Sequence, residues 1–313
     1  MKKLTFITAI ILGSIGISQA ALTWSWGGSS GSQDQANAIT SAMNTAVGNY
    51  NQYASFNGNI QVCYNSGVPT AQTDGYQGLI EFGGSISARV AQHEMGHWMG
   101  CGTYSDWNNH RNGNNQWTGA AAIAQLAAYD GAGSIVNADS LHFWPYGWNY
   151  DNEGPADRNI GMVCAFRKDM GLSDGISGSW CFMQNRTSGL VIDSRGATSA
   201  GSQVAQWSKV NSSNLKWKLV ASDSGYYYIQ NQTTGLYLDG GGSTSWGAAV
   251  KEWSYDSSYN LQWKLVPSDS GNYYIKNRAT GLYLDGGGAT ANGAALKQWG
   301  YANSSNLQWS LQW

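Results

Sequence analysis

The sequence predicts an N-terminal α+β domain followed by an all-β domain made of three 46-residue repeats. The repeats are visible because the segment 185–193 recurs at 231–239 and 277–285 without gaps. Each repeat alternates short apolar runs with Gly, Ser and Asn turns, which is typical of short strands. Helical spacing of apolar residues characterises the half before residue 172, so we place the domains at 21–172 and 180–313.

Residues 1–20 predict an export signal. Two lysines at positions 2 and 3 precede the apolar stretch 4–13, and small residues at 18–20 suit a cleavage site. The apolar stretch is too short to span a membrane. We therefore expect a mature chain that begins near Ala21 and is secreted, extracellular or periplasmic, with no membrane partner.

The composition favours neutral ligands. Charged residues make up 12% of the chain, about half the usual share of about 25%, and the net charge is −2. This balance argues against nucleic acid as a partner. With 16 Trp and 18 Tyr, the surface suits neutral polymers such as polysaccharides, and we expect a monomer.

Four cysteines follow the export signal: Cys63, Cys101, Cys164 and Cys181. An even count in an exported chain predicts two disulfides, with three possible pairings. No C-x-x-C spacing occurs, so the cysteines do not predict a zinc site of their own.

In the N-terminal half, apolar spacing predicts helices over 33–53, 87–99, 118–129 and 156–170. Strands are expected over 59–64 and 78–82. Helix 87–99 carries His93 and His97 four residues apart and therefore on one face, where they can hold one metal ion. Glu94 lies beside them and can take a proton from the attacking water. The pattern predicts a Zn2+ hydrolase centre.

The His-Glu-x-x-His motif and Gly100 resemble those of zincin metallopeptidases. This resemblance implies a zincin-like fold for 21–172, a protein or peptide substrate and endopeptidase activity. It also implies that the strand before the motif helix offers its edge to an extended substrate. Thr103 stands where the metzincin subclass has its third ligand and is a poor ligand for zinc.

The third ligand is expected from the two remaining histidines. His142 opens the aromatic segment 142–150, which should line a cleft because so many exposed rings are otherwise costly. His110 lies in a polar loop and is the alternative, and an acidic or non-protein ligand is also open. We favour His142. Tyr146 is a candidate donor to the oxyanion of the reaction.

The repeats carry the pattern Gly-Leu-Tyr-Leu-Asp, then Asn-Gly-Ala-Ala-x-x-x-Trp, then Asn-Leu-Gln-Trp, and resemble ricin-B-type lectin repeats, which form a β-trefoil. The resemblance implies three sugar sites, each with an Asp, a stacking Trp and an Asn. These are Asp193, Trp207 and Asn214; Asp239, Trp253 and Asn260; and Asp285, Trp299 and Asn306.

Other residues of the repeats leave questions open. The family's usual Gln-x-Trp reads Leu-x-Trp here at Trp217, Trp263 and Trp309, and the loss of this polar group leaves the identity of the sugar undetermined. These three Trp are expected in the core. Tyr255 and Tyr301 are alternative stacking rings.

Two further hypotheses start from three acidic residues near the end of the first domain. Asp151, Glu153 and Asp157 could hold calcium or act as a glycosidase pair, although we favour a turn with solvated carboxylates over both. The leading hypothesis is a secreted zinc endopeptidase held on glycans by its trefoil. The alternatives are a lectin with a catalytically silent N-terminal domain and a carbohydrate-active enzyme.

Overall fold

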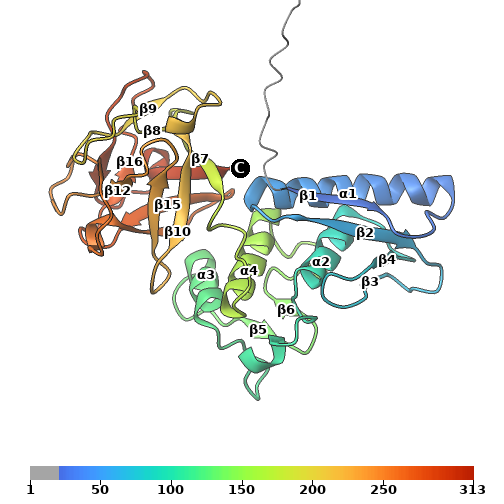
Figure 1. Cartoon of the computed structure of the whole chain (residues 1–313). Coiled ribbons are helices and arrows are strands. Elements are labelled where there is room, and N and C mark those ends of the chain that lie inside the picture. Colours follow the sequence, from blue (N-terminus) through green and yellow to red (C-terminus); the bar gives the residue numbers. More distant parts are fainter. Residues whose placement is uncertain (1–20) are drawn as a thin grey trace, which may run out of the picture.

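The computed structural model describes residues 21–313, so the predicted export signal lies outside the described residues. Figure 1 shows two bodies, an α+β body in blue and green and an all-β body in yellow to red. Each has its own buried cluster, one drawn from residues 22–170 and one from residues 181–311.

A four-stranded sheet forms one side of the N-terminal domain. Its strands are β1 (Leu22–Trp26), β2 (Gly58–Tyr64), β3 (Ala71–Thr73) and β4 (Ile80–Phe82), in the order β1-β2-β4-β3. The first three in that order are parallel, and β3 pairs antiparallel with β4. The prediction that the strand before the motif helix forms the edge of the sheet is therefore wrong. That strand is β4, which lies inside the sheet, and β3 forms the edge.

Four helices complete this domain: α1 (Gln33–Tyr53), α2 (Ala88–Trp98), α3 (Ala120–Asp130) and α4 (Ala156–Asp169). A capping box between Ser32 and Gln35 begins α1, and the Ser87 hydroxyl accepts from Val90 N to begin α2. Helix α1 lies against β1, α2 and α4 (Figure 1). A small hairpin of β5 (Asn137–Ala138) and β6 (Phe143–Trp144) comes before α4.

The C-terminal domain is one twelve-stranded sheet whose pairings repeat three times. Its strands are β7 (Trp180–Asn185), β8 (Val191–Asp193), β9 (Ala205–Trp207), β10 (Trp217–Ala221), β11 (Tyr227–Asn231), β12 (Tyr237–Asp239), β13 (Lys251–Trp253), β14 (Gln262–Pro267), β15 (Asn272–Asn277), β16 (Tyr283–Asp285), β17 (Lys297–Trp299) and β18 (Gln308–Gln312). β18 pairs with β7, which joins the last repeat to the first. The trefoil expectation is thereby met.

The core position expected for Trp217, Trp263 and Trp309 is confirmed. All three are fully buried. Each indole Nε1 donates to a backbone carbonyl of its own repeat at 2.9–3.0 Å. The large rings fill the centre while their only polar atom stays paired, which is what a buried Trp requires.

Helices α1 and α3 contact the trefoil strands β18 and β14, and α4 supplies polar contacts between the two domains. Asp157 Oδ2 accepts from Gly271 N at 2.6 Å, and Lys168 Nζ donates to the Tyr227 hydroxyl at 3.0 Å. Within residues 21–313, no helix has the length and apolar character to cross a bilayer.

The predicted disulfides are wrong, because all four cysteines are free thiols. Cys181 is buried in the trefoil core, whereas Cys101 and Cys164 belong to the N-terminal core. Cys63 lies on β2 beside Glu81. Burial raises the pKa of Cys101 to about 12, so this thiol stays protonated. The even count did not reveal that Cys63 and Cys181 lie apart from Cys101 and Cys164, which share the N-terminal core.

Candidate metal centre and carbohydrate sites

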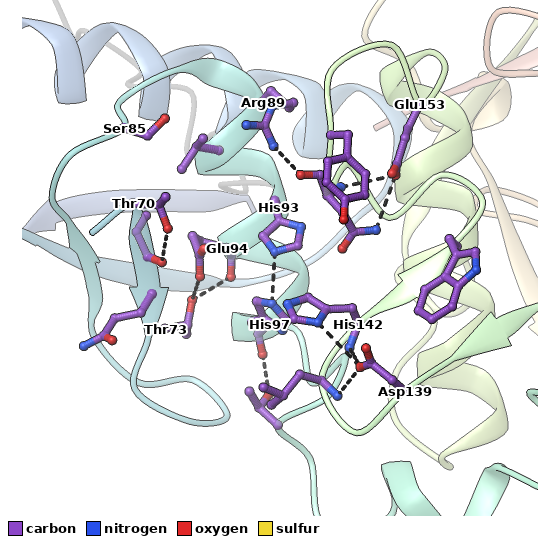
Figure 2. A pocket seen from close by; sticks show the side chains of 18 residues that line it. Thr70, Thr73, Ser85, Arg89, His93, Glu94, His97, Asp139, His142 and Glu153 are labelled. Carbon is purple, nitrogen blue, oxygen red and sulfur yellow. Dashed lines mark hydrogen bonds and ion pairs between the residues drawn. The ribbon is translucent and has the colours of Figure 1, made fainter. Parts of the chain in front are cut away.

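Three histidines meet at the end of α2. His93 and His97 lie on one face of this helix, and His142 comes from the β5–β6 hairpin (Figure 2). Each offers one ring nitrogen, and these atoms lie within 4.8 Å of one another. Among the described residues, this is the one group of three or more His, Cys, Asp or Glu side chains close enough to share a metal ion.

Hydrogen bonds orient two of the rings. His93 Nδ1 donates to Gly147 O at 2.9 Å, and His97 Nδ1 donates to Cys101 O at 2.7 Å. A carbonyl oxygen only accepts, so Nδ1 carries the proton in both rings and Nε2 has a free lone pair. The two Nε2 atoms face each other at 3.2 Å. This is the orientation that metal-ligating histidines adopt.

The backbone around Gly102 allows His142 to reach the helix. A Cβ at Gly102 would lie 2.0 Å from the Leu141 carbonyl oxygen, so only glycine permits this close approach. Asp139 then fixes the turn, because its Oδ1 accepts from Leu141 N at 2.8 Å and His142 N at 2.6 Å. The same oxygen is 3.5 Å from His142 Nδ1.

Glu94 lies beside the histidines and is held by the edge strand β3. Thr73 Oγ1 is 2.9 Å from Glu94 Oε2 and 2.9 Å from the Glu94 carbonyl oxygen, and it can donate to one or the other (Figure 2). Burial raises the pKa of Glu94 to about 7, partly offset by the Thr73 hydroxyl. The carboxyl is therefore fixed in place and can exchange a proton near neutral pH.

Burial acts on the histidines in the opposite direction. It lowers the pKa of His93 to about 4, with the neighbouring His97 as the second cause, and it lowers the pKa of His97. Both rings are neutral at pH 7, the form that binds metal. A cavity of about 660 Å³ opens in front of the cluster, bordered by the 70–73 segment on one side and by Trp144 and Tyr150 of the aromatic segment on the other.

Two predicted residues lie elsewhere. The Tyr146 hydroxyl donates to Asp130 Oδ1 at 2.6 Å and contacts Arg158, so the predicted oxyanion donor does not face the cavity. His110 pairs with Asp106 at 2.9 Å and is separate from the histidine cluster. His142, the favoured candidate, is the one that joins His93 and His97.

The three acidic residues near the end of the first domain do not converge. Asp151 pairs with Arg89 at 2.8 Å, and Asp157 accepts from the trefoil backbone. Glu153 lines the cavity and accepts from Asn149 N at 3.2 Å. These three carboxylates are therefore too far apart to share a calcium ion, so the calcium hypothesis is wrong. They also include no close pair of the kind that a glycosidase needs.

Sequence reasoning missed Thr73 and Asp139, which position Glu94 and His142. The Asp-x-x-His spacing of 139–142 is a turn signal that could have indicated Asp139. Thr73 had no local signal, because its contact with Glu94 depends on the pairing of β3 with β4.

The nine predicted sugar-site residues occupy equivalent places in the three repeats. In each repeat an Asp ends one strand and a Trp ends the next, and the antiparallel register puts both side chains on the same face of the hairpin. The backbone N–H after each Asp donates to the carbonyl of the Asn at 3.0–3.1 Å, which brings the third residue alongside. The exposed fractions are 42% for Trp207, 42% for Trp253 and 38% for Trp299.

Each Asp also has a structural role. Oδ1 of Asp193, Asp239 and Asp285 accepts a backbone N–H two residues later at 2.7–2.8 Å. Among residues 21–313, all their hydrogen bonds go to Oδ1, which leaves Oδ2 for a ligand. Burial raises the pKa of Asp239 and of Asp285.

A pocket lies at the site of the first repeat. Asp193, Trp207 and Asn214 line a cavity of about 500 Å³, and Asn214 Nδ2 donates to Asp193 Oδ1 at 2.7 Å. The alternative rings Tyr255 and Tyr301 are exposed, and each packs against two tyrosines of its own repeat.

Comparison with known proteins identifies the trefoil. The family model of ricin-type beta-trefoil lectin domain-like proteins matches residues 172–253, 214–299 and 259–312. No curated protein matches the chain.

Solved structures also resemble it. The designed three-fold symmetric protein ThreeFoil has 36% identity, a TM-score of 0.41, and coverage of 42% of this chain and 96% of its own. An exo-beta-1,3-galactanase from Clostridium thermocellum has 29% identity and a TM-score of 0.41, and the match covers 44% of this chain and only 32% of the galactanase. A Macrolepiota procera ricin B-like lectin in complex with lactose has 18% identity, a TM-score of 0.38, and coverage of 43% and 95%.

The family match covers the three repeats, and their strand pairings close in the same threefold manner that the sequence predicts. Residues 172–312 therefore belong to the ricin-type β-trefoil lectin domain-like family.

Proposed function

We propose that this protein binds carbohydrate through its trefoil and carries a zinc-dependent peptidase centre in its N-terminal domain. The carbohydrate proposal has the stronger support. It rests on the threefold recurrence of a buried Asp beside a partly exposed Trp on one face of a hairpin.

The chemistry of these residues suits a neutral sugar. The free Oδ2 of each Asp can accept from sugar hydroxyls, and the Trp ring can pack against the C–H face of a pyranose. The Asn side chain adds a donor or an acceptor at the same edge. The low charge of the chain agrees with a neutral ligand.

The test is binding of residues 21–313 to an array of neutral glycans that includes lactose. In the variant, Asp193, Asp239 and Asp285 are each replaced by Asn, which keeps an Oδ1 for the turn and removes the charge. We expect about a tenfold to hundredfold loss of affinity, since a hydrogen bond to a charged group contributes about 1.5–3 kcal/mol. Asp34→Asn, at an exposed position of α1, is the control. Absence of glycan binding by the unaltered chain would refute the proposal.

The zinc proposal rests on the donor set. Three imidazoles converge, two with their Nε2 lone pairs fixed towards each other at 3.2 Å. Nitrogen ligands of a tetrahedral zinc ion, each about 2.0–2.1 Å from the metal, are about 3.3 Å apart. The residues therefore fit this ion, with His93, His97 and His142 as ligands. When bound, zinc supplies the Lewis acidity that activates water and polarises a peptide carbonyl.

The remaining steps belong to the chain itself. The β3 edge can pair with an extended peptide that enters the cavity, since segment 70–73 borders it. Thr73 holds the Glu94 carboxyl, whose oxygen takes the proton of the attacking water and returns it to the leaving amine. Arg89 donates to the carbonyl oxygens of Trp148 and Asn149 and so steadies the opposite wall.

Casein cleavage tests this second function. Glu94→Gln should retain zinc and lose cleavage by about a hundredfold or more, because the variant keeps the side-chain shape without the base. Glu153→Gln, in the same cavity, is the matched control and should stay active. If the unaltered chain binds glycans and cleaves no protein, the alternative of a lectin with a silent N-terminal domain replaces the peptidase proposal.

A further inference from the structure

The three trefoil sites differ in a residue that comes from the neighbouring repeat. In every repeat a glycine N–H donates to the strand that carries the next Trp: Gly201 to Glu252 O at 2.7 Å, Gly247 to Gln298 O at 2.8 Å, and Gly293 to Gln206 O at 2.8 Å. The residue before each glycine is Ala200 for the second site, Trp246 for the third and Asn292 for the first.

At the third site this residue adds a second indole. The Trp246 ring lies 5.5 Å from the Trp299 ring, centroid to centroid, with 43° between the planes. Trp246 is 64% exposed, more than Trp299 itself. Two large, partly exposed rings thus pack against each other, and Trp299 shares its face of the hairpin with Asp285.

The backbone below is adapted to this ring. A Cβ at Gly300 would lie 2.4 Å from Cζ2 of Trp246, so glycine makes room for the indole. The equivalent positions in the other repeats are Ser208 and Ser254. Asn292 instead accepts from Ser208 N at 2.7 Å, so the first site uses this position for a polar contact.

We propose that Trp246 and Trp299 together form a two-ring platform that binds two consecutive sugar units of an oligosaccharide. The inference rests on the carbohydrate binding proposed above. Each ring presents a flat apolar face to one pyranose, and the tilt between them follows a bend in the chain. The third site then selects oligosaccharides, whereas the first and second sites, each with one Trp, hold a single sugar unit.

The experiment isolates the third site in a chain with Asp193→Asn and Asp239→Asn. Affinities are measured for three pairs of probes: galactose and lactose, glucose and cellobiose, and xylose and xylobiose. Trp246→Ala should lower the disaccharide-to-monosaccharide affinity ratio about three- to tenfold, the value of one aromatic stacking contact. Trp26→Ala, an exposed Trp of the N-terminal domain, should leave the ratio unchanged.

A gain-of-function variant tests the proposal without relying on a loss of binding, which misfolding of Trp246→Ala could also cause. Ala200→Trp with Ser254→Gly transfers the platform to the second site and should raise the ratio there, measured with the first and third sites disabled by Asp→Asn. A ratio that does not change in Trp246→Ala, in a chain that still binds sugar, overturns this inference alone. If the unaltered chain binds none of the six sugars and no array glycan, the proposed carbohydrate function fails as well.

Discussion

Glu252 is a buried acid at a position where the other two repeats have glutamine. Gln206 Nε2 donates to Gly286 O at 2.9 Å, and Gln298 Nε2 donates to Gly240 O at 2.6 Å. Both bonds link a strand to the backbone just after a site Asp of another repeat. Replacing Glu252 by Gln should restore the third bond of this set.

The 46-residue repeat identifies Ser194 O as the acceptor that corresponds to Glu252. An ionised carboxylate cannot donate to a carbonyl, and Glu252 Oε2 is buried without a hydrogen-bond partner, while Oε1 accepts from Thr234 at 2.6 Å. Burial raises the pKa of Glu252 to about 7; the hydrogen bond from Thr234 lowers this pKa, and the nearby Asp193 charge raises it.

The sign follows from linkage. The folded-state pKa lies above the unfolded value of 4.5, so the folded chain binds the proton more tightly. Stability is fully present below about pH 4.5 and falls as the pH rises to about 7. The shift corresponds to about 3 kcal/mol, and Glu252→Gln should recover about that much above pH 7 and little near pH 4.5. For a domain of this size this is roughly 6–12 °C in Tm.

The assay is denaturant unfolding of the trefoil, followed by Trp fluorescence at pH 5, 6, 7 and 8. Gln298→Glu, the reverse change in the third repeat, should destabilise by a similar amount at pH 8 and less at pH 5. A Glu252→Gln effect of equal size at pH 5 and pH 8 would refute the reasoning, because it could not arise from ionisation.

Two more predictions concern the metal centre. Gly102→Ala should displace Leu141, destabilise the domain by about 1–3 kcal/mol and lower zinc affinity through the loss of His142, as measured by unfolding and by competition with a chelator; unchanged zinc affinity would contradict the role of this close approach. Thr73→Val should keep zinc and reduce casein cleavage about tenfold, because Glu94 loses its hydrogen bond; full activity would show that Glu94 needs no such support.

The helices were predictable where local signals were strong. The expected helix 33–53 coincides with α1, because apolar spacing and the Ser32 capping box agree. Strand β3 was missed, because Ala71–Thr73 has only three residues and owes its conformation to pairing with β4. Strand β1 was also missed, since Leu22–Trp26 lies directly after the predicted export signal.

The metal ligands were predictable because the sequence contains few residues that could serve as ligands. With only four histidines, two of them in the motif, the third could be chosen from His110 and His142. Tyr146 was misplaced because its orientation depends on Asp130 and Arg158, which are distant in sequence and meet it only after α3 and α4 pack. Side-chain direction within an irregular loop is a tertiary property that no spacing rule encodes.

The repeats were the most informative part of the sequence, because each position was observed three times. A Trp kept at 217, 263 and 309 predicted the core, and the structure buries all three in the same way. The same comparison exposes the exceptions, since Glu252 and Trp246 each depart from the residues of the other two repeats.

Zinc content tests the three-histidine assignment at the candidate active site most directly. The chain is purified with zinc available and analysed by inductively coupled plasma mass spectrometry, beside His142→Ala and His110→Ala. We predict one zinc ion per chain, retained in His110→Ala and lost in His142→Ala after dialysis against a weak chelator. A chain without zinc, or equal retention in both variants, would contradict the assignment of His93, His97 and His142 as the metal ligands.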